Sequence, residues 1–136
     1  MKDAVSIGIE ELPFIHSLPE IIKIEYDIIT LSIDAFFYQL NDETVNLKFE
    51  NIVGFRVLDE GNILEFWNKK RPQGWVWEVL ENGWFDLEKT RGGFVLGYID
   101  DNRPKEYIVL GVNDCVSVLT YSSPIISEVK NKDESR

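Results

Sequence analysis

The chain has 136 residues, of which 44% are hydrophobic and 12% aromatic, enough to bury one sizeable core and form one domain. Its 24 acidic residues against 14 basic ones give a formal net charge of −10 at pH 7. That charge repels phosphate backbones and anionic lipid, so nucleic acid and membrane surfaces are excluded as expected partners and a basic protein is favoured.

The N-terminus lacks the apolar stretch and small-residue cleavage site of a signal peptide, and no run of about 18 apolar residues occurs. We therefore expect a cytoplasmic protein. Cys115 is the single cysteine, and its place at the start of an apolar strand predicts a buried small hydrophobe rather than a nucleophile. His16 is the single histidine, and we expect it in a loop or in packing because no second histidine completes a metal site.

The first half of the chain is typical of β-structure, because β-branched and aromatic residues alternate with polar ones. Asp27 is expected to break the strand pattern, and a polar turn is expected at 41–44. A meander of antiparallel strands is the simplest topology. The predicted strands lie around residues 5–9, 21–26, 28–38, 45–49 and 52–60.

A short helix is predicted at residues 63–69. Asn62 stands three residues before Glu65, a spacing like that of a capping box, and Pro72 follows the segment. The basic triplet 69–71 would lie at the C-terminal end of this helix, where it opposes the negative pole of the helix dipole. We prefer that structural role to phosphate binding.

The stretch from Gly74 to Glu88 holds three of the four tryptophans and an Asn82-Gly83 pair between two apolar runs, which predicts a tight hairpin with a type I′ turn. Its core face would hold Val76, Leu80, Phe85 and Leu87. Its other face would hold Trp75, Trp77, Val79 and Trp84 beside Glu81, Asp86 and Glu88. Large aromatic side chains mixed with acidic ones are typical of a partly solvated surface that a binding partner can cover.

A second interpretation of residues 84–92 is a short helix. Trp84, Leu87, Glu88 and Arg91 would then share one side, and Gly92 would end the helix. Under this interpretation Trp84 leaves the tryptophan face.

The last third of the chain predicts more strands. A strand at 94–99 is followed by a turn at 100–104 and by a hairpin of strands 106–111 and 115–121. The two hairpin strands are apolar nearly throughout, so we expect them in the middle of a sheet, covered on both faces. The domain is predicted to span 1–127, followed by a mobile polar tail at 128–136.

No catalytic motif emerges. Cys115 has only His16 as a conceivable base, and the Gly92-Gly93 pair lacks the spacing of a phosphate loop. The acidic clusters 59–60 and 100–102 do not match a calcium loop and are typical of turns. We therefore predict no catalytic residue, no metal and no cofactor.

Residues 52–61, 74–80 and 106–124 resemble small bacterial proteins of unassigned function, some of which are thought to be immunity proteins encoded beside polymorphic toxins. The resemblance implies an inhibitor-like role in which an acidic domain caps the active site of a cognate, often basic, toxin. It brings no functional residue to a position of this chain.

These observations predict a mainly β fold, an antiparallel meander sheet or half-barrel with one or two short helices, or α+β if the helices are longer. The expected function is non-enzymatic binding of a basic protein; the oligomeric state stays open. A small-molecule-binding half-barrel and a carboxylate- or metal-dependent hydrolase are the alternatives. The structural alternative for the tryptophans is that they face a second core layer. The predicted binding residues are Trp75, Trp77 and Trp84 as anchors, with Glu81, Asp86 and Glu88 around them.

Overall fold

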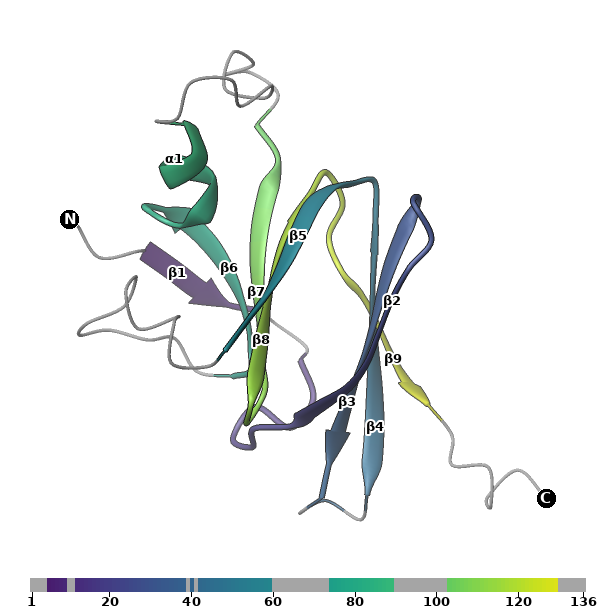
Figure 1. Cartoon of the computed structure of the whole chain (residues 1–136). Helices are drawn as coiled ribbons and strands as arrows, with labels where there is room; N and C mark the ends of the chain where they lie inside the picture. The colour runs from purple at the N-terminus through teal and green to yellow at the C-terminus, as the bar shows by residue number, and fades with distance from the viewer. Residues whose placement is uncertain are drawn as a thin grey trace.

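The computed structural model describes residues 5–9, 12–38, 40, 42–59, 74–89 and 103–129 (Figure 1). Nearly all regular structure in these residues is β-strand. The strands are β1 (Val5–Gly8), β2 (Glu20–Tyr26), β3 (Thr30–Phe37), β4 (Glu43–Glu50), β5 (Ile52–Asp59), β6 (Val76–Glu81), β7 (Lys105–Leu110), β8 (Asp114–Thr120) and β9 (Ile125–Val129), and the helix is α1 (Trp84–Lys89).

The strands form two antiparallel sheets that face each other. Sheet A has five strands in the order β1-β6-β7-β8-β5, and sheet B has four in the order β2-β3-β4-β9. β2-β3-β4 and β6-β7-β8 are meanders, whereas β5 pairs with β8 and β9 pairs with β4. The predicted mainly β, antiparallel fold is confirmed.

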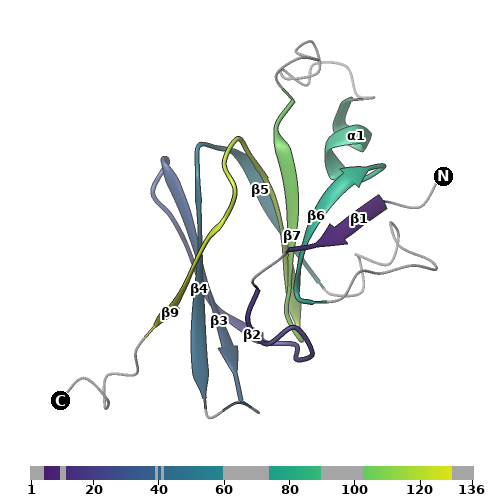
Figure 2. The ribbon, with the colours of Figure 1, turned by 180° about the vertical axis from the view of Figure 1, so that it is seen from behind.

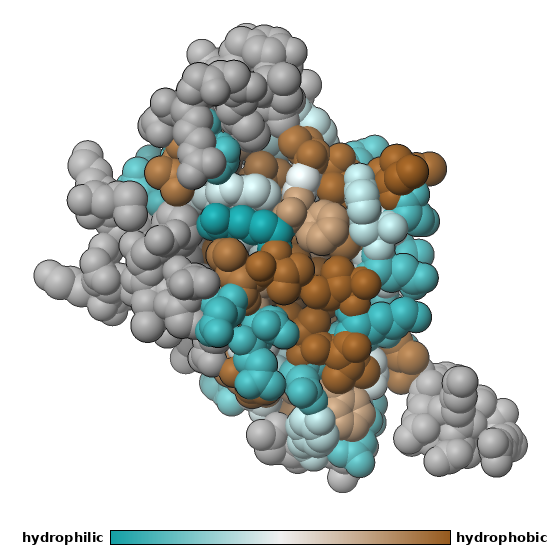
Figure 3. All heavy atoms as spheres, in the orientation of Figure 1, coloured by the Kyte–Doolittle hydropathy of each residue, from teal (hydrophilic) through white to brown (hydrophobic). Residues whose placement is uncertain are grey.

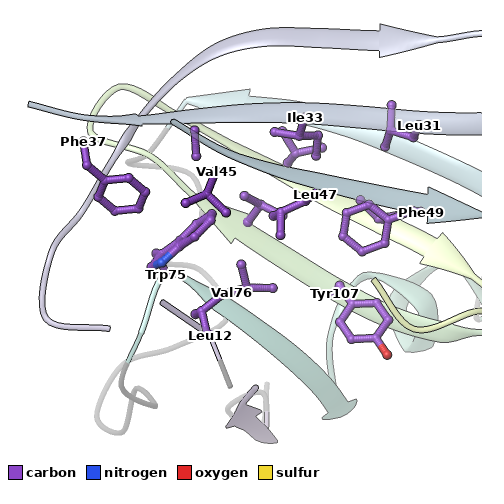
Figure 4. Packing of buried hydrophobic residues seen from close by; sticks show 14 residues of the cluster. Leu12, Leu31, Ile33, Phe37, Val45, Leu47, Phe49, Trp75, Val76 and Tyr107 are labelled. Atoms are coloured by element: carbon purple, nitrogen blue, oxygen red, sulfur yellow. The ribbon is translucent and has the colours of Figure 1, made fainter. Parts of the chain in front are cut away.

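The main core lies between the sheets and follows the alternation of the strands (Figure 4). Sheet B contributes every second residue of β3 and β4, which are Leu31, Ile33, Ala35, Phe37, Val45, Leu47 and Phe49. Aromatic pairs join the two sheets: the ring centroids of Phe37 and Trp75 are 5.2 Å apart, and those of Phe49 and Tyr107 are 5.6 Å apart. Edge-to-face and tilted aromatic pairs of this kind stabilise the contact between the sheets in addition to the apolar area that they bury.

Sheet A is also covered on its outer face. A second cluster of buried residues lies there, made of Trp77, Val79, Ile108 and Cys115, with Leu58, Leu87 and Leu110 packed against it. β7 and β8 are therefore buried on both sides, as their apolar sequences predict, and their hairpin is confirmed. Cys115 is a buried free thiol, as expected.

The hairpin predicted at Asn82-Gly83 is wrong, and the alternative helix is confirmed as α1. After β6 the chain turns through Asn82, whose φ is +62°, and the carboxylate of Asp86 accepts a hydrogen bond from the Asn82 N–H at 2.7 Å. The carboxylate of Glu106 accepts from the first N–H groups of the helix, at Trp84 and Phe85. β6 instead pairs with β1 and β7, and Leu80, predicted in the core, is exposed.

The turn between β2 and β3 confirms the predicted break at Asp27. One oxygen of the Asp27 carboxylate accepts hydrogen bonds from the N–H groups of Ile29 and Thr30. β4 and β5 also lie where strands are predicted.

β9 corrects the predicted boundary at residue 127, because Glu128 and Val129 belong to this strand. They pair with Val45 and Thr44 of β4. Three of the five residues of β9, Ile125, Ile126 and Val129, are apolar and β-branched, but the charged sequence that follows led to a predicted boundary inside the strand.

Several predictions lie outside the described residues: the helix at 63–69, the basic triplet at 69–71, the strand at 94–99, the acidic cluster at 100–102 and the chain after Val129. In the part of the chain that is described, no helix has the length and apolar character needed to cross a bilayer.

Candidate functional site

Two of the predicted tryptophan anchors are buried. Trp75 is 0% exposed in the main core, and Trp77 is 3% exposed in the second cluster. The indole N–H of Trp75 donates to the Pro13 carbonyl at 2.8 Å, and that of Trp77 donates to the Gly74 carbonyl at 3.0 Å. Their prediction as surface anchors is therefore wrong, and the alternative, that they face core layers, holds for both.

The third anchor, Trp84, is half-buried on α1. Its ring lies 4.8 Å from the guanidinium carbon of Arg56 and packs near Gly54 of β5. The helix thus covers this end of sheet A, and Trp84 is part of that cover.

The three predicted acids do not form one surface with the tryptophans. Glu81 is exposed at the end of β6, and Glu88 is half-buried on α1. The Asp86 carboxylate accepts a hydrogen bond from the Asn82 N–H and forms a salt bridge with the Arg103 guanidinium at 2.7 Å. Asp86 is therefore a structural residue of the turn. Of the six predicted site residues, the structure brings together only Trp84, Asp86 and Glu88, on one helix.

A cleft of about 650 Å³ lies elsewhere, between β1 and β9. Each of these is an edge strand of its sheet, β1 of sheet A and β9 of sheet B (Figure 2). The residues that line the cleft are Ile7, Gly8, Ile9, Pro13, Glu78, Tyr107, Ser123, Pro124, Ile126, Ser127 and Glu128. We call it the edge cleft.

Strand register places one carboxylate from each sheet in the edge cleft. In sheet A, Glu78 pairs with Ile7 on one side and with Tyr107, a core residue, on the other. In sheet B, Glu128 pairs with the buried Val45, so it too lies on the core-facing side. Because side chains alternate along a strand, Glu78 and Glu128 enter the space between the sheets from opposite walls.

Ser123 of the edge cleft is hydrogen-bonded to two side chains of β7. Tyr107 donates from its hydroxyl to the Ser123 oxygen at 3.4 Å, and Lys105, outside the lining, donates to the same oxygen at 3.2 Å. Burial raises the pKa of Tyr107; the hydrogen bond with Ser123 opposes the rise, and the Glu78 charge adds to it. The Tyr107 hydroxyl therefore stays protonated and able to donate.

The charge of the edge cleft is negative. Its described lining holds the carboxylates of Glu78 and Glu128 and no Lys or Arg side chain. Apolar side chains of Ile7, Ile9 and Ile126 lie beside these polar groups. A cleft of this kind accepts a ligand that has a cationic group next to apolar surface.

On the other side of the sandwich, β2 and β5 are the edge strands of their sheets. The rings of Tyr26 and Phe55 join them, with centroids 5.1 Å apart. Apolar residues gather over this part of the surface (Figure 3), and Ile22, Tyr26 and Val57 are exposed. These three exposed side chains carry no charge, so the edge cleft is the better candidate site.

Sequence reasoning missed the residues of the edge cleft. Glu78 gave the one local signal, because it interrupts the otherwise apolar side of its strand. Glu128 lay in the predicted tail, and nothing local indicates that it lines the same cleft as Glu78.

Neither a cluster of metal ligands among the described residues nor a similar protein identifies the function of this site. In the described part of the chain, no three His, Cys, Asp or Glu side chains gather as a metal site would require. Comparison of the chain with protein-family models, curated proteins and solved structures finds no significant match.

Proposed function

We propose that this chain is a non-enzymatic binding protein that holds a basic partner protein at the edge cleft. The observation that carries the proposal is the pair of carboxylates, Glu78 and Glu128, which enter from opposite sheets into a cleft whose described lining has no basic side chain. A basic side chain placed between them would meet two negative charges.

Charge also acts at longer range. The net charge of −10 attracts a basic protein during diffusion and speeds its encounter, most strongly at low salt. The apolar lining of the cleft then supplies contacts that salt does not screen. The proposal thus separates steering by the whole surface from recognition in the cleft.

The resemblance to immunity proteins suggests which basic protein is bound. An acidic domain of this size could cover the active site of a cognate toxin and neutralise it. We include this role in the proposal as its most specific form.

The test is a pull-down from lysate of the native organism at low and at high salt, with mass spectrometry of the retained proteins. Three baits are compared: the wild type, the cleft variant Glu78→Gln with Glu128→Gln, and a control variant with the same charge change, Glu25→Gln with Glu50→Gln. Glu25 and Glu50 are exposed and lie outside the cleft lining. The proposal predicts a basic protein that the wild type and the control retain at low salt and that the cleft variant loses.

Equal loss from the cleft variant and the control would show that only net charge matters, and the edge cleft would be rejected as the site. Retention of no stoichiometric partner by the wild type at either salt would reject the protein-binding function.

The volume of the edge cleft also favours a second candidate, binding of a small cationic molecule. Its 650 Å³ exceeds the lower bound of about 300 Å³ for ligand pockets, and Tyr107 offers a directed hydroxyl. A thermal-shift screen of cationic metabolites would test it, because a true ligand must stabilise the wild type and not the cleft variant. Turnover of such a ligand would instead indicate the carboxylate-dependent hydrolase.

A further inference from the structure

β9 offers an open strand edge beside the edge cleft. One edge of β9 is hydrogen-bonded to β4 through five residue pairs that run from Thr44–Val129 to Lys48–Ile125. Among the described strands, none pairs with its other edge. The backbone groups on that edge can bond to an added strand.

The side chains of β9 leave this edge accessible. Ile125 and Val129 are 49% and 42% exposed, and Pro124 precedes the strand rather than interrupting it. Its one charged side chain, Glu128, points to the core-facing side, into the edge cleft.

We propose that the partner contributes an extended basic segment that adds to the open edge of β9 as a further strand of sheet B. This inference rests on the proposed function and specifies how the partner is held. Main-chain hydrogen bonds to β9 would supply affinity, and side chains that enter the edge cleft would supply specificity.

The register of β9 sets the pattern of the added segment. Ile126 and Glu128 are two positions apart and lie on the same side of the strand. The residues opposite them are also two apart, so the segment needs an apolar residue facing Ile126 and a Lys or Arg facing Glu128. That basic side chain would enter the cleft, where Glu78 of the other sheet supplies a second carboxylate.

Charge argues that the occupant is not a second copy of this chain. A β9 strand from another copy would bring its own Glu128 and a net charge of −10 to the same cleft. Inward-pointing charge on an edge strand discourages self-pairing in this way, yet it favours a strand of opposite charge.

The test uses synthetic peptides as probes. A capped peptide of about ten residues alternates threonine with valine and lysine, so that valine and lysine share one side when it is extended. Two derivatives carry backbone N-methyl groups at every second residue. One phase is methylated at the odd-numbered residues of the peptide and the other phase at the even-numbered residues. In an added strand only one phase of N–H groups faces β9, so one derivative should lose binding and the other should keep it.

We expect the disruptive phase to weaken binding at least about tenfold, as measured by calorimetry, and the other phase to change it less than about twofold. The cleft variant should also bind the unmodified peptide at least about tenfold more weakly than the Glu25→Gln, Glu50→Gln control does. Peptide binding should slow hydrogen exchange of alternate amides in β9. A peptide with glutamate in place of lysine should not bind.

Several results would overturn the inference. Strand addition is wrong if both N-methylated peptides bind as tightly as the unmodified peptide, or if the unmodified peptide does not bind. The proposed function would still stand in that case, provided that the cleft variant loses the partner in the pull-down. If the wild type retains no partner there, the proposed function itself fails. A dimer of the free protein in sedimentation that is lost on adding the peptide would mean that a second copy normally occupies this edge.

Discussion

The carboxylate of Glu106 on β7 accepts a hydrogen bond from the backbone N–H of Phe85 at 2.8 Å, across 21 residues of sequence. Its other oxygen accepts from the Trp84 N–H at 2.9 Å. Glu106 is only 3% exposed, so the carboxyl group of a buried residue of β7 takes the place of a local cap at the start of α1.

Glu106→Ala should lower the free energy of unfolding by about 1–3 kcal/mol at neutral pH, because it leaves the N–H groups of Trp84 and Phe85 without their acceptor. Chemical denaturation followed by circular dichroism measures the loss. Glu50→Ala, on an exposed side chain of β4, is the control and should change the free energy of unfolding by less than about 0.5 kcal/mol. An equal effect of the two variants would contradict the capping role of Glu106.

Stability should also depend on pH through Glu106. Burial raises its pKa, although the hydrogen bonds from Phe85 and Trp84 and the charge of Arg56 act in the other direction. The unfolded chain therefore releases this proton at a lower pH than the folded protein does. Between those two pKa values the unfolded state binds fewer protons, so the free energy of unfolding falls as the pH rises.

The Glu106 contribution is thus most favourable below the ordinary glutamate pKa and declines as the pH passes through the raised, folded-state pKa. Denaturation of the wild type and of Glu106→Gln between about pH 4 and pH 7 isolates it, because the other carboxylates cancel in the difference. The advantage of the wild type should shrink with rising pH. An advantage that grows with pH would mean that the hydrogen bonds outweigh burial and hold the pKa down.

Gly83 packs directly on this carboxylate. A Cβ atom added at Gly83 would lie 2.6 Å from an oxygen of Glu106 and 2.5 Å from a methyl group of Val79. Gly83→Ala should therefore cost about 1–3 kcal/mol of stability through overpacking, measured by thermal and chemical unfolding. Gly54→Ala is the matched control, because its added Cβ would meet only the Trp84 ring at 3.9 Å and should be tolerated.

The same contacts explain which elements could be predicted from the sequence. β3 and β4 carry their pattern locally, since one face is buried and the other is not, and the alternation of their residues predicts both strands. α1 depends on Glu106, which is distant in sequence, so local turn preference at Asn82-Gly83 favoured a hairpin. β6 is covered on both faces of sheet A. Its alternate residues therefore do not divide into a buried apolar side and a solvent-exposed polar side, and the sequence pattern could not tell the two faces apart.

The candidate site was out of reach for a related reason. The edge cleft exists only because β1 and β9, the outermost strands of two different sheets, end on the same side of the sandwich. Long-range pairing of β9 with β4 places Glu128 there, and the charged sequence after Val129 made Glu128 part of a predicted tail instead of a strand. The sequence pattern instead favoured the aromatic residues Trp75 and Trp77 as binding anchors, and both are buried in the core.

Trp75→Ala should therefore unfold or strongly destabilise the protein, by about 3–5 kcal/mol, because it empties a fully buried site and loses the hydrogen bond to Pro13. Trp84→Ala should cost less, since this side chain is only half-buried and packs on Arg56 and Gly54. Near-ultraviolet circular dichroism and denaturation of the two variants make the comparison. A folded Trp75→Ala protein with unchanged stability would restore Trp75 as a candidate for surface binding.

Ile28 occupies a backbone conformation that a β-branched residue rarely adopts. Its φ is +82° in the three-residue connection between β2 and β3, and its side chain is 80% exposed, so little packing compensates for the strain. Ile28→Gly should raise the free energy of unfolding by about 1 kcal/mol, after the larger chain entropy of glycine in the unfolded state is subtracted. Ile29 follows it, is 70% exposed and has no positive φ, so Ile29→Gly should be neutral or destabilising. Parallel urea titrations of the two variants and the wild type measure the difference; stabilisation by both substitutions, or by neither, would show that strain at Ile28 is not the cause.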